Sequence, residues 1–491
     1  MTERADPIVS RPWLGAQAAR RPDGLALVDV DGRAVHFGDL AASAEALARR
    51  LRGAGCGPGA RIAALMNPCR RFVELIHAAQ QLGVALVPLN DRLQTDELAA
   101  QVLNADPAWL LYDDEHAEPA HALCARVPAL RPVGAAGDLD RLPASRGALP
   151  DHVDPQALHS IIYTSGTTGA AKGVVLTNAN HYASATASMQ RLGQHADDVW
   201  LSPLPLYHVG GLSIPLRAAL GGFAVMLMRR FDADAVDRAL RTQRVTLLSL
   251  VPTMLVRLLD AAGDARVPPG VRCALIGGGG CPPDLIARAR AHGIPAVPTY
   301  GMTEAASQIC TADADDIATA PGSVGRPLAG LDLRVLDPDA IGWGQIAVRG
   351  PQITPGYFRN TEATAHAFDG GWLRTGDIGR VDDAGRVWVL GRGADLVVTG
   401  GEKVVPEEVE AALATHPSVQ EAAVYGVPDP LWGERVAAAV VLRPGAELAP
   451  ADLRAWCRRR VAGFKVPRQF QVVPTLPRTA SGKVQRHLLR S

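Results

Sequence analysis

A strand-like segment that runs directly into a loop of serine, threonine and glycine constrains this chain more than any other feature. Residues 160–174 begin with an apolar run, continue as Thr164-Ser165-Gly166-Thr167-Thr168-Gly169, and then reach Lys172. Glycines let backbone N–H groups approach an anion closely, hydroxyls add donors, and the lysine adds positive charge. No Gly-Lys-Ser/Thr closes the loop, so it is not a Walker A motif. The stretch predicts a phosphate-binding loop and not a flexible Ser/Gly surface loop.

Composition narrows the class of protein. The chain has 491 residues, enough for two to four domains, and 47% of them are apolar, which indicates large folded cores. Lys plus Arg and Asp plus Glu number 50 each, so no basic field for nucleic acid is expected. Seven scattered cysteines without a CxxC pair indicate reduced thiols of a cytoplasmic protein, not disulfides or a zinc site. No apolar run approaches the roughly 18 residues that a membrane span requires, so no membrane insertion is expected.

Short apolar runs alternate with helical patterns up to about residue 300, which is typical of parallel sheets covered by helices. A hairpin is expected over residues 25–37, followed by a helix from residue 40 with Asp39 at its N-cap. After residue 330, three strand-like runs separated by turns predict a smaller barrel-like subdomain, and residues 395–491 read as a separate α+β domain. We therefore expect an α/β protein with a large N-terminal domain, residues 1–394, and a small C-terminal domain, residues 395–491.

Six separated motifs occur in one order along the chain. They are residues 163–173, 204–211, 300–304, 372–377, 391–395 with 400–410, and 477–483. A lone Thr-Gly-Asp or Gly-Lys would mean little, because the first is usually a turn and the second a solvated tail. Together, the six resemble the adenylate-forming enzymes, which include the acyl-CoA synthetases, the adenylation domains of peptide synthetases and firefly luciferase. The resemblance covers the chain from about residue 160 to its end.

The resemblance implies a two-step reaction. A carboxylic acid and ATP give acyl-AMP and pyrophosphate, and coenzyme A then gives acyl-CoA and AMP. Because the attacking carboxylate and the α-phosphate are both negative, such an enzyme must hold them together and neutralise the charge that develops. The resemblance also implies that the C-terminal domain rotates between the two steps about a hinge at Asp395, so that Lys483 and then the Gly400-Gly401 stretch face the adenylate.

The matching motif positions imply roles for individual residues. Thr303 would reach the α-phosphate, Glu304 would bind Mg²⁺, and Lys483 would be the catalytic cation. Nucleotide and CoA contacts are implied for Thr164, Ser165, Gly166, Thr167, Thr168, Gly169, Lys172, Gly278, Gly279, Tyr300, Gly301, Asp377, Arg392, Gly400 and Gly401. Tyr300 would face adenine, and Asp377 would accept the ribose hydroxyls with Arg392 beside it.

The identity of the acid is constrained by the loop around His208, which resembles the part of the family that lines the acyl pocket and gates the thiol. No aspartate lies in this loop to pair with an ammonium, so an amino acid substrate is not expected. Residues 180–182, 204–213, 251–255, 277–280 and 300–309 resemble the branch of the family that ligates o-succinylbenzoate to CoA for menaquinone biosynthesis. The second carboxylate of that acid would need a partner in the pocket. The substrate candidates are His208, Gly277, Ser307 and Arg230, with Arg229 beside the last.

Four alternatives stay open at this point. They are a CoA ligase for another aryl or medium-chain acid, a stand-alone enzyme that loads a carrier protein, a luciferase-like oxygenase that shares the adenylation step, and a non-catalytic nucleotide binder. Retention of Lys172, Glu304, Asp377, Arg392 and Lys483 argues against the last. The partners expected are therefore a small carboxylic acid, ATP and CoA, and a homo-oligomer is left open.

Overall fold

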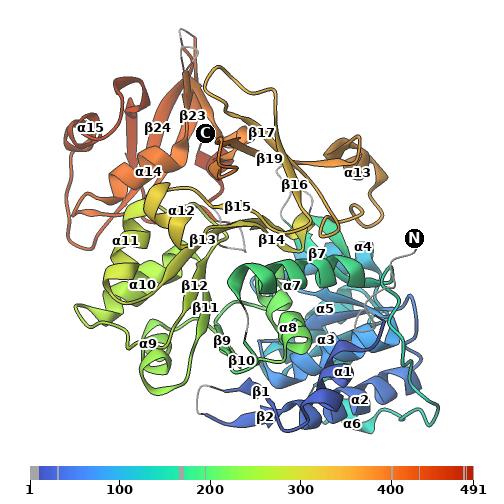
Figure 1. Ribbon diagram of the computed structural model, residues 1–491. Coiled ribbons are helices and arrows are strands. Elements are labelled where there is room, and N and C mark those ends of the chain that lie inside the picture. The colour runs from blue at the N-terminus through green and yellow to red at the C-terminus, as the bar shows by residue number, and fades with distance from the viewer. Residues whose placement is uncertain are drawn as a thin grey trace. The chain divides into compact units, whose positions relative to one another are not determined.

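The computed structural model of the chain (Figure 1) describes residues 10–29, 32–135, 137–164, 171–193, 195–399, 402–430, 432–478, 482 and 484–489. The chain forms two compact units. The first consists of Met1–Leu333 and Val348–Leu373, and the second of Arg334–Ala347 and Arg374–Ser491. The expected α/β class, with a large N-terminal part and a small C-terminal part, is confirmed. The boundary at residues 394 and 395 stays a prediction.

A six-stranded sheet of the first unit contains the strand that leads into the Ser/Thr/Gly loop. Its order is β6-β5-β3-β4-β7-β8. The strands are β3 (Arg61–Leu65), β4 (Ala85–Pro88), β5 (Trp109–Tyr112), β6 (Arg131–Gly134), β7 (Leu158–Thr164) and β8 (Lys172–Thr177). Neighbours pair in parallel except β7 and β8, which are antiparallel. Strands begin near residues 61, 84 and 108, in line with the expected alternation of apolar runs and helical patterns, because continuous apolar runs suit strands that are buried on both faces.

Four helices precede or follow strands of this sheet: α2 (Phe37–Gly53), α3 (Arg70–Leu82), α4 (Thr95–Ala105) and α5 (Ala117–Arg126). Helix α1 (Trp13–Arg20) lies earlier in the chain and packs against α2. A short α6 (Asp138–Arg141) follows β6. The assignment of Asp39 as an N-cap is wrong, since α2 begins at Phe37 with His36 at the cap. Asp39 lies in the first turn instead, where its carboxylate still interacts favourably with the helix dipole.

A nine-stranded sheet completes the first unit, in the order β15-β14-β13-β12-β11-β9-β10-β1-β2. The strands are β1 (Leu25–Val28), β2 (Ala34–His36), β9 (Val199–Ser202), β10 (Ala224–Leu227), β11 (Leu247–Leu250), β12 (Cys273–Ile276), β13 (Ala296–Met302), β14 (Ser307–Thr311) and β15 (Arg326–Pro327). The central strands are parallel, while β2, β14 and β15 pair antiparallel at the edges. The expected hairpin of residues 25–37 is therefore present as β1 and β2.

The helices between these strands are α7 (Asn178–Leu192), α8 (Val209–Gly221), α9 (Ala233–Thr242), α10 (Pro252–Ala262), α11 (Pro283–Ala291) and α12 (Ala314–Thr319). Helices α7 and α8 pack side by side, and both contact β14 (Figure 1). This packing brings the helix that follows His208 to the strand that begins at Ser307. The same unit also contains α13 (Thr361–Ala367) and β18 (Phe368–Asp369).

Two five-stranded sheets contain the remaining strands of the described residues. One contains β16 (Asp332–Leu336), β17 (Gly344–Arg349), β19 (Trp372–Val381), β18 and β20 (Val387–Arg392), and the chain passes from one unit to the other within β16, β17 and β19. The other, in the order β22-β21-β24-β23 with β25 on β24, belongs to the second unit. Its elements are β21 (Val397–Thr399), β22 (Glu402–Val404), β23 (Val419–Asp429), β24 (Gly433–Leu442), β25 (Gln469–Val472), α14 (Pro406–Ala414) and α15 (Pro450–Arg458).

Each of the seven cysteines is a free thiol, as their spacing predicts. Within the described ranges, the structure holds no helix with the length and apolar character of a membrane span.

Candidate active site

The Ser/Thr/Gly loop joins the ends of two antiparallel strands. Thr164, the last residue of β7, pairs in register with Lys172, the first residue of β8. Ser165, Gly166, Thr167, Thr168 and Gly169 lie outside the described residues, so their predicted phosphate contacts stay predictions. The ammonium nitrogen of Lys172 lies 5.4 Å from the centroid of the Tyr357 ring. A lysine at the mouth of the loop therefore rests on an aromatic face.

The motif of residues 300–304 forms the end of β13 and a single 3₁₀ turn, Thr303–Ala305. The chain reverses sharply here into β14, so that Gly301 pairs with Gln308. A Cβ on Gly301 would lie 1.8 Å from the carbonyl oxygen of Ser307, so the reversal requires glycine. Ala306 and Ser307 have φ of 49° and 119°, values that L residues seldom adopt. Strained backbone of this kind is a common feature of functional sites.

Glu304 is the residue in this turn that suits a divalent cation. Its side chain is buried, with 8% of the residue exposed. Its Oε1 accepts a hydrogen bond of 3.0 Å from the Tyr357 hydroxyl, and its backbone carbonyl accepts one of 2.8 Å from Thr354 N–H. Among the described residues, the side-chain partner of this buried carboxylate is a neutral hydroxyl and not a cation. Such an oxygen ligand fits Mg²⁺, a hard cation that is bound through one or two carboxylates and phosphate oxygens.

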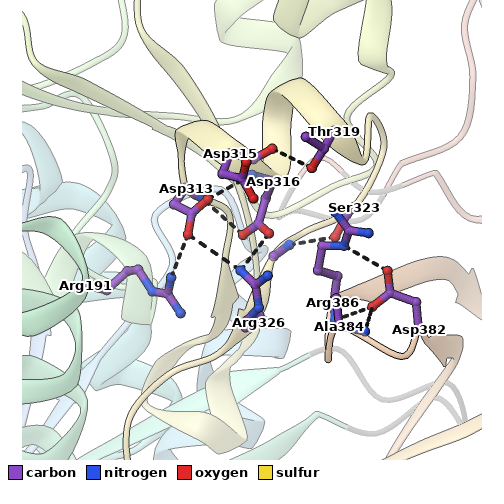
Figure 2. Close-up of polar contacts among 11 residues, drawn as sticks. Arg191, Asp313, Asp315, Asp316, Thr319, Ser323, Arg326, Asp382, Ala384 and Arg386 are labelled. Atoms are coloured by element: carbon purple, nitrogen blue, oxygen red, sulfur yellow. Dashed lines mark hydrogen bonds and ion pairs between the residues drawn. The ribbon is translucent and has the colours of Figure 1, made fainter.

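A cluster of three aspartates lies at the start of α12 (Figure 2), where the carboxylates of Asp313, Asp315 and Asp316 lie within 4.8 Å of one another. Asp313 and Asp316 form a reciprocal capping box, and the Asp316 carboxylate is fully buried. Arg326 Nη1 lies 2.8 Å from Asp316 Oδ1, and Arg191 Nη1 lies 3.5 Å from Asp313 Oδ2. Because Asp313 and Asp316 cap the helix and pair with arginines, these two carboxylates anchor the start of α12.

His208 is the N-cap residue of α8, and its ring centroid lies 4.6 Å from that of Tyr207. Tyr207 is anchored in turn, because its hydroxyl interacts with the carboxylate of Asp91. His116 Nε2 lies 3.6 Å from Asp91 Oδ2, and its other ring nitrogen contacts Asp113. The hydrogen bonds to Asp113 and Asp91 raise the pKa of His116 to about 9. A charged histidine between two aspartates therefore supports the loop that carries His208.

The remaining substrate candidates fall in two places. Gly277 follows β12 directly, and Gly278 and Gly279 continue the turn beside it. Ser307 begins β14, and the hydroxyl of Ser184 on α7 donates to the carbonyl of Ala306 before it. Arg230, in contrast, has a 75% exposed side chain and lies 3.7 Å from Glu115, which also pairs with Arg229 at 2.8 Å.

Arg217 was not among the residues predicted from sequence, and the structure singles it out. It lies on α8, nine residues after His208, with 2% of the residue exposed. Among the described residues, its Nε and Nη2 have no hydrogen-bond partner, and its guanidinium carbon lies 5.6 Å from the Trp200 ring centroid. Burial lowers its pKa to about 10, so it stays charged at neutral pH. The sequence signal was an arginine inside an otherwise apolar helix.

The second unit holds the residues assigned to the ribose. Asp377 and Arg392 form a cross-strand pair on β19 and β20, with Arg392 Nε 3.1 Å from Asp377 Oδ1. Arg392 Nη1 also donates to the Thr375 carbonyl at 2.6 Å, and the Thr375 hydroxyl accepts from Asp377 N–H at 3.1 Å. Only 6% of Asp377 is exposed. The structure therefore holds this carboxylate in a fixed orientation next to the arginine that was predicted to assist it.

The predicted hinge residue Asp395 closes a 3₁₀ turn, Gly393–Asp395, and is bound by an arginine near the C-terminus. Arg486 Nη1 lies 3.3 Å from Asp395 Oδ2, and its Nη2 lies 3.0 Å from Glu407 and 2.9 Å from Glu410. Gly400, Gly401 and Lys483 lie outside the described residues. Their predicted roles are untested by the geometry.

The family models that match the chain describe AMP-binding enzymes, and its curated relatives include 2-succinylbenzoate–CoA ligases. The family model described as AMP-binding enzyme matches residues 14–358, and that of the AMP-binding enzyme C-terminal domain matches residues 408–483. The chain is 37% identical over 482 residues to a 2-succinylbenzoate–CoA ligase of Bacillus anthracis, with 97% of each chain covered. It is 36% identical to a ligase of the same name from Bacillus mycoides, with 97% of this chain and 98% of that one covered.

Solved structures that match the chain include a synthetase for the same acid. The o-succinylbenzoate CoA synthetase (MenE) of Bacillus subtilis, in complex with the acyl-adenylate intermediate OSB-AMP, matches with a TM-score of 0.92, 34% identity and 98% coverage of both chains. The same synthetase with ATP and magnesium ion matches with a TM-score of 0.91, 34% identity, and coverage of 98% and 99%. ATP-bound MatB from Rhodopseudomonas palustris matches with a TM-score of 0.88, 31% identity and 98% coverage of both.

Proposed function

Because the chain belongs to the AMP-binding enzyme family, we propose that it is an ATP-dependent, AMP-forming acid–CoA ligase whose acid is o-succinylbenzoate. In the first step an oxygen of the carboxylate attacks the α-phosphate, the bond to the β-phosphate breaks, and pyrophosphate leaves. In the second step the CoA sulfur attacks the acyl carbon, the thiol proton is lost, and AMP leaves. The observation that carries this proposal is the match along almost the whole chain to ligases of that name.

The residues of the first unit have the chemistry that the first step needs. Lys172 and the loop after Thr164 would bind the β- and γ-phosphates, while Thr303 would donate to the α-phosphate. Glu304 would hold Mg²⁺, which neutralises phosphate charge when it is bound. The reversal at Gly301 fixes Thr303 and Glu304 on one short turn, so that their spacing does not depend on a flexible loop.

The second unit contains the residues proposed for the ribose, and the chain segment with Lys483 belongs to it. Asp377 would accept the ribose hydroxyls with Arg392 beside it, and Lys483 would bridge the attacking carboxylate and the α-phosphate. We propose that residues 395–491 act as a C-terminal domain that turns about Asp395 between the two steps. Gly400 and Gly401 would then line the path of the thiol. The free thiols and the family together favour a cytoplasmic enzyme of menaquinone biosynthesis.

The second carboxylate of o-succinylbenzoate needs a counter-charge, and two arginines are candidates. Arg230 was proposed from sequence, but its guanidinium is exposed and lies near Glu115. Arg217 is buried on the helix that His208 begins, and two of its donor nitrogens have no described partner. A buried cation without a counter-ion is costly unless a ligand supplies one. We therefore favour Arg217, with His208, Gly277 and Ser307 as further contacts to the acid.

The test is release of AMP and pyrophosphate by the full chain with ATP, Mg²⁺ and CoA. The acids compared are o-succinylbenzoate, benzoate, 4-chlorobenzoate, octanoate and phenylalanine. We expect CoA-dependent turnover with o-succinylbenzoate alone, and a loss of about 100-fold or more in Lys483→Ala, the size of effect seen when a transition-state charge partner is removed.

Three other outcomes are informative. Turnover with a monocarboxylate would overturn the assignment of o-succinylbenzoate as the substrate, while the proposed reaction type would stand. Acid-dependent pyrophosphate exchange without acyl-CoA formation would favour an enzyme that loads a carrier protein. Absence of exchange with every acid would contradict the proposal that the chain is a ligase for any of them.

A further inference from the structure

We propose that Tyr357 is a positioning residue for the ATP half-reaction, in which its hydroxyl orients the Glu304 carboxylate for a divalent cation and its ring holds Lys172. The inference rests on the proposed function, because that function makes Glu304 the metal ligand and Lys172 a phosphate ligand. Tyr357 lies in none of the six motifs that identify the family in this sequence. Its role follows from contacts between residues far apart in the chain.

A single side chain meets both functional groups. The Tyr357 hydroxyl donates to Glu304 Oε1 at 3.0 Å, while Lys172 Nζ lies 5.4 Å from the centroid of the same ring. The hydroxyl of Tyr357 therefore binds a carboxylate, while the face of its ring contacts an ammonium group. Both uses match the electrostatics of the ring, whose face is negative and whose hydroxyl proton is positive.

The backbone around Tyr357 is attached to the elements that carry its two partners. Val175 N–H donates to the Gly356 carbonyl at 3.1 Å, and Phe358 N–H donates to the Gly173 carbonyl at 2.7 Å, which joins the segment to β8. Thr354 N–H donates to the Glu304 carbonyl at 2.8 Å. Because β8 begins at Lys172, these bonds fix the ring between the lysine strand and the Glu304 turn.

Two further features hold the ring in place. The backbone N–H of Tyr357 donates to Thr364 Oγ1 at 2.9 Å. Gly356 has φ of 146°, and a Cβ at that position would lie 2.5 Å from Thr364 Cγ2, so a larger residue would push the segment away. The direction of the phenol hydroxyl is therefore set by the fold and does not depend on a bound ligand.

The two contacts differ in strength, and the difference suits the reaction. The hydroxyl–carboxylate bond is charge-assisted, so it fixes one oxygen of Glu304 and directs the other toward a cation. A cation–π contact contributes less than a phosphate ion pair and leaves the ammonium free to move. Tyr357 would thus keep Glu304 in one orientation throughout, and would release Lys172 when ATP arrives.

The proposal is tested by calorimetric binding of ATP to the full chain, once with Mg²⁺ and once with EDTA. In Tyr357→Phe we expect the Kd of MgATP to rise about five- to tenfold, as for loss of one charge-assisted hydrogen bond, and the Kd of metal-free ATP to stay within about twofold. Tyr357→Leu also removes the ring under Lys172, so it should change the metal-free Kd by more than about twofold.

Two controls separate this role from a structural one. Tyr112→Phe removes the hydroxyl of another mostly buried tyrosine, which meets His121 at 3.3 Å, and should leave both constants unchanged. In a Glu304→Gln background, Tyr357→Phe should have no further effect on MgATP binding. Thermal unfolding of each variant verifies that it is folded.

Equal weakening of ATP with and without Mg²⁺ in Tyr357→Phe, or no weakening at all, would overturn the role of the hydroxyl. Equal metal-free binding by the Phe and Leu variants would overturn the role of the ring. Because ATP binding needs no acid, these results stay distinct from failure of the proposed substrate.

Discussion

At the scale of single residues, the contrast between Arg217 and Arg230 gives a direct prediction. Arg217→Met keeps the length of the side chain and removes the charge. If Arg217 pairs with the second carboxylate, the KM for o-succinylbenzoate should rise about 30-fold or more, as when one partner of a buried charge pair is lost. The KM for ATP should stay within about twofold, because this arginine would not touch the nucleotide. Initial rates of pyrophosphate release against acid concentration give the first constant, and the same rates against ATP concentration give the second.

Arg230→Met is the matched control. Its guanidinium is 75% exposed and lies 3.7 Å from Glu115, so its loss should change the KM for the acid by less than about twofold. Without substrate, the thermal stability of Arg217→Met should equal or exceed that of the wild type, because the substitution removes a buried charge with two unpartnered nitrogens. A rise in KM in Arg230→Met alone would transfer the role to that residue.

The site residues that could be identified from the sequence are those whose role is apparent from their immediate neighbours in the chain. Gly301 and Glu304 stand in one short motif, and a tight turn with a carboxylate can be read from neighbouring letters. For Arg217 the only local signal is an arginine within an apolar helix, and Tyr357 could not be identified in this way, because the importance of both residues depends on what surrounds them. One is notable for lacking a partner in a core, and the other for joining residues 172 and 304.

At the scale of elements, the stability of the second unit should depend on Arg486. Arg486 joins the turn of Asp395 to α14 through Glu407 and Glu410, and its own side chain is only 12% exposed. Burial raises the pKa of both glutamates, against the attraction of the arginine. Arg486→Met would therefore leave carboxylates in a poorly solvated place without their cation. We expect it to destabilise this unit by about 3 kcal/mol, as for other broken buried pairs.

Hydrogen exchange measured by mass spectrometry checks this prediction on the strands β23 and β24. The amides there should exchange about 100-fold faster in Arg486→Met, the factor that corresponds to the expected loss of stability.

Glutamates with a raised pKa bind protons more readily in the folded state, so the loss of stability in Arg486→Met should be smaller at pH 5 than at pH 8. Arg478→Met, which breaks an exposed 2.8 Å pair with Glu421, should have little effect. Equal exchange in the two variants would contradict a special role for Arg486.

Helices and strands could be predicted from the sequence where a single local pattern of apolar residues determines them. The buried strands of both large sheets are continuous apolar runs, and they form where expected. The start of α2 was misplaced because a good capping residue, Asp39, was available two residues inside the helix. The antiparallel pairing of β7 and β8 was not predicted, since strand direction depends on where the chain returns and not on its local composition.

At the scale of the whole molecule, the pH dependence of stability should reflect the buried histidines of the first unit. Burial lowers the pKa of His77 to about 3 and that of His159 to about 4, and it holds that of His181 well below its usual value. The rings of His159 and His181 lie 4.8 Å apart, and His181 also lies near the charge of Arg217. Protons therefore cannot enter this part of the core without placing several positive charges together.

The sign of the effect follows from these shifts. In the unfolded chain the three histidines bind protons below pH of about 6.5, whereas in the folded chain they stay neutral until about pH 4 or lower. Stability should fall as the pH decreases from about 6.5 toward 4, with the unfolded state taking up to about three more protons than the folded state. His116 acts oppositely, because its pKa is raised to about 9, so its contribution is lost as the pH rises from 6.5 to 9. Maximal stability is therefore expected at about pH 6.5, where the two ranges meet.

Urea unfolding at pH 7, 6 and 5, followed by tryptophan fluorescence, measures the acid side of this dependence. His159→Phe removes one of the three groups that must stay neutral, so its free energy of unfolding should fall with pH about one third less steeply than that of the wild type. His195→Gln changes an exposed histidine of the same unit and should leave the slope unaltered. If both variants keep the slope of the wild type, His159 binds a proton equally well in the folded and unfolded chain, and the acid sensitivity must come from other groups. If only His159→Phe flattens it, the buried histidines set the acid limit within which the adenylation site stays folded.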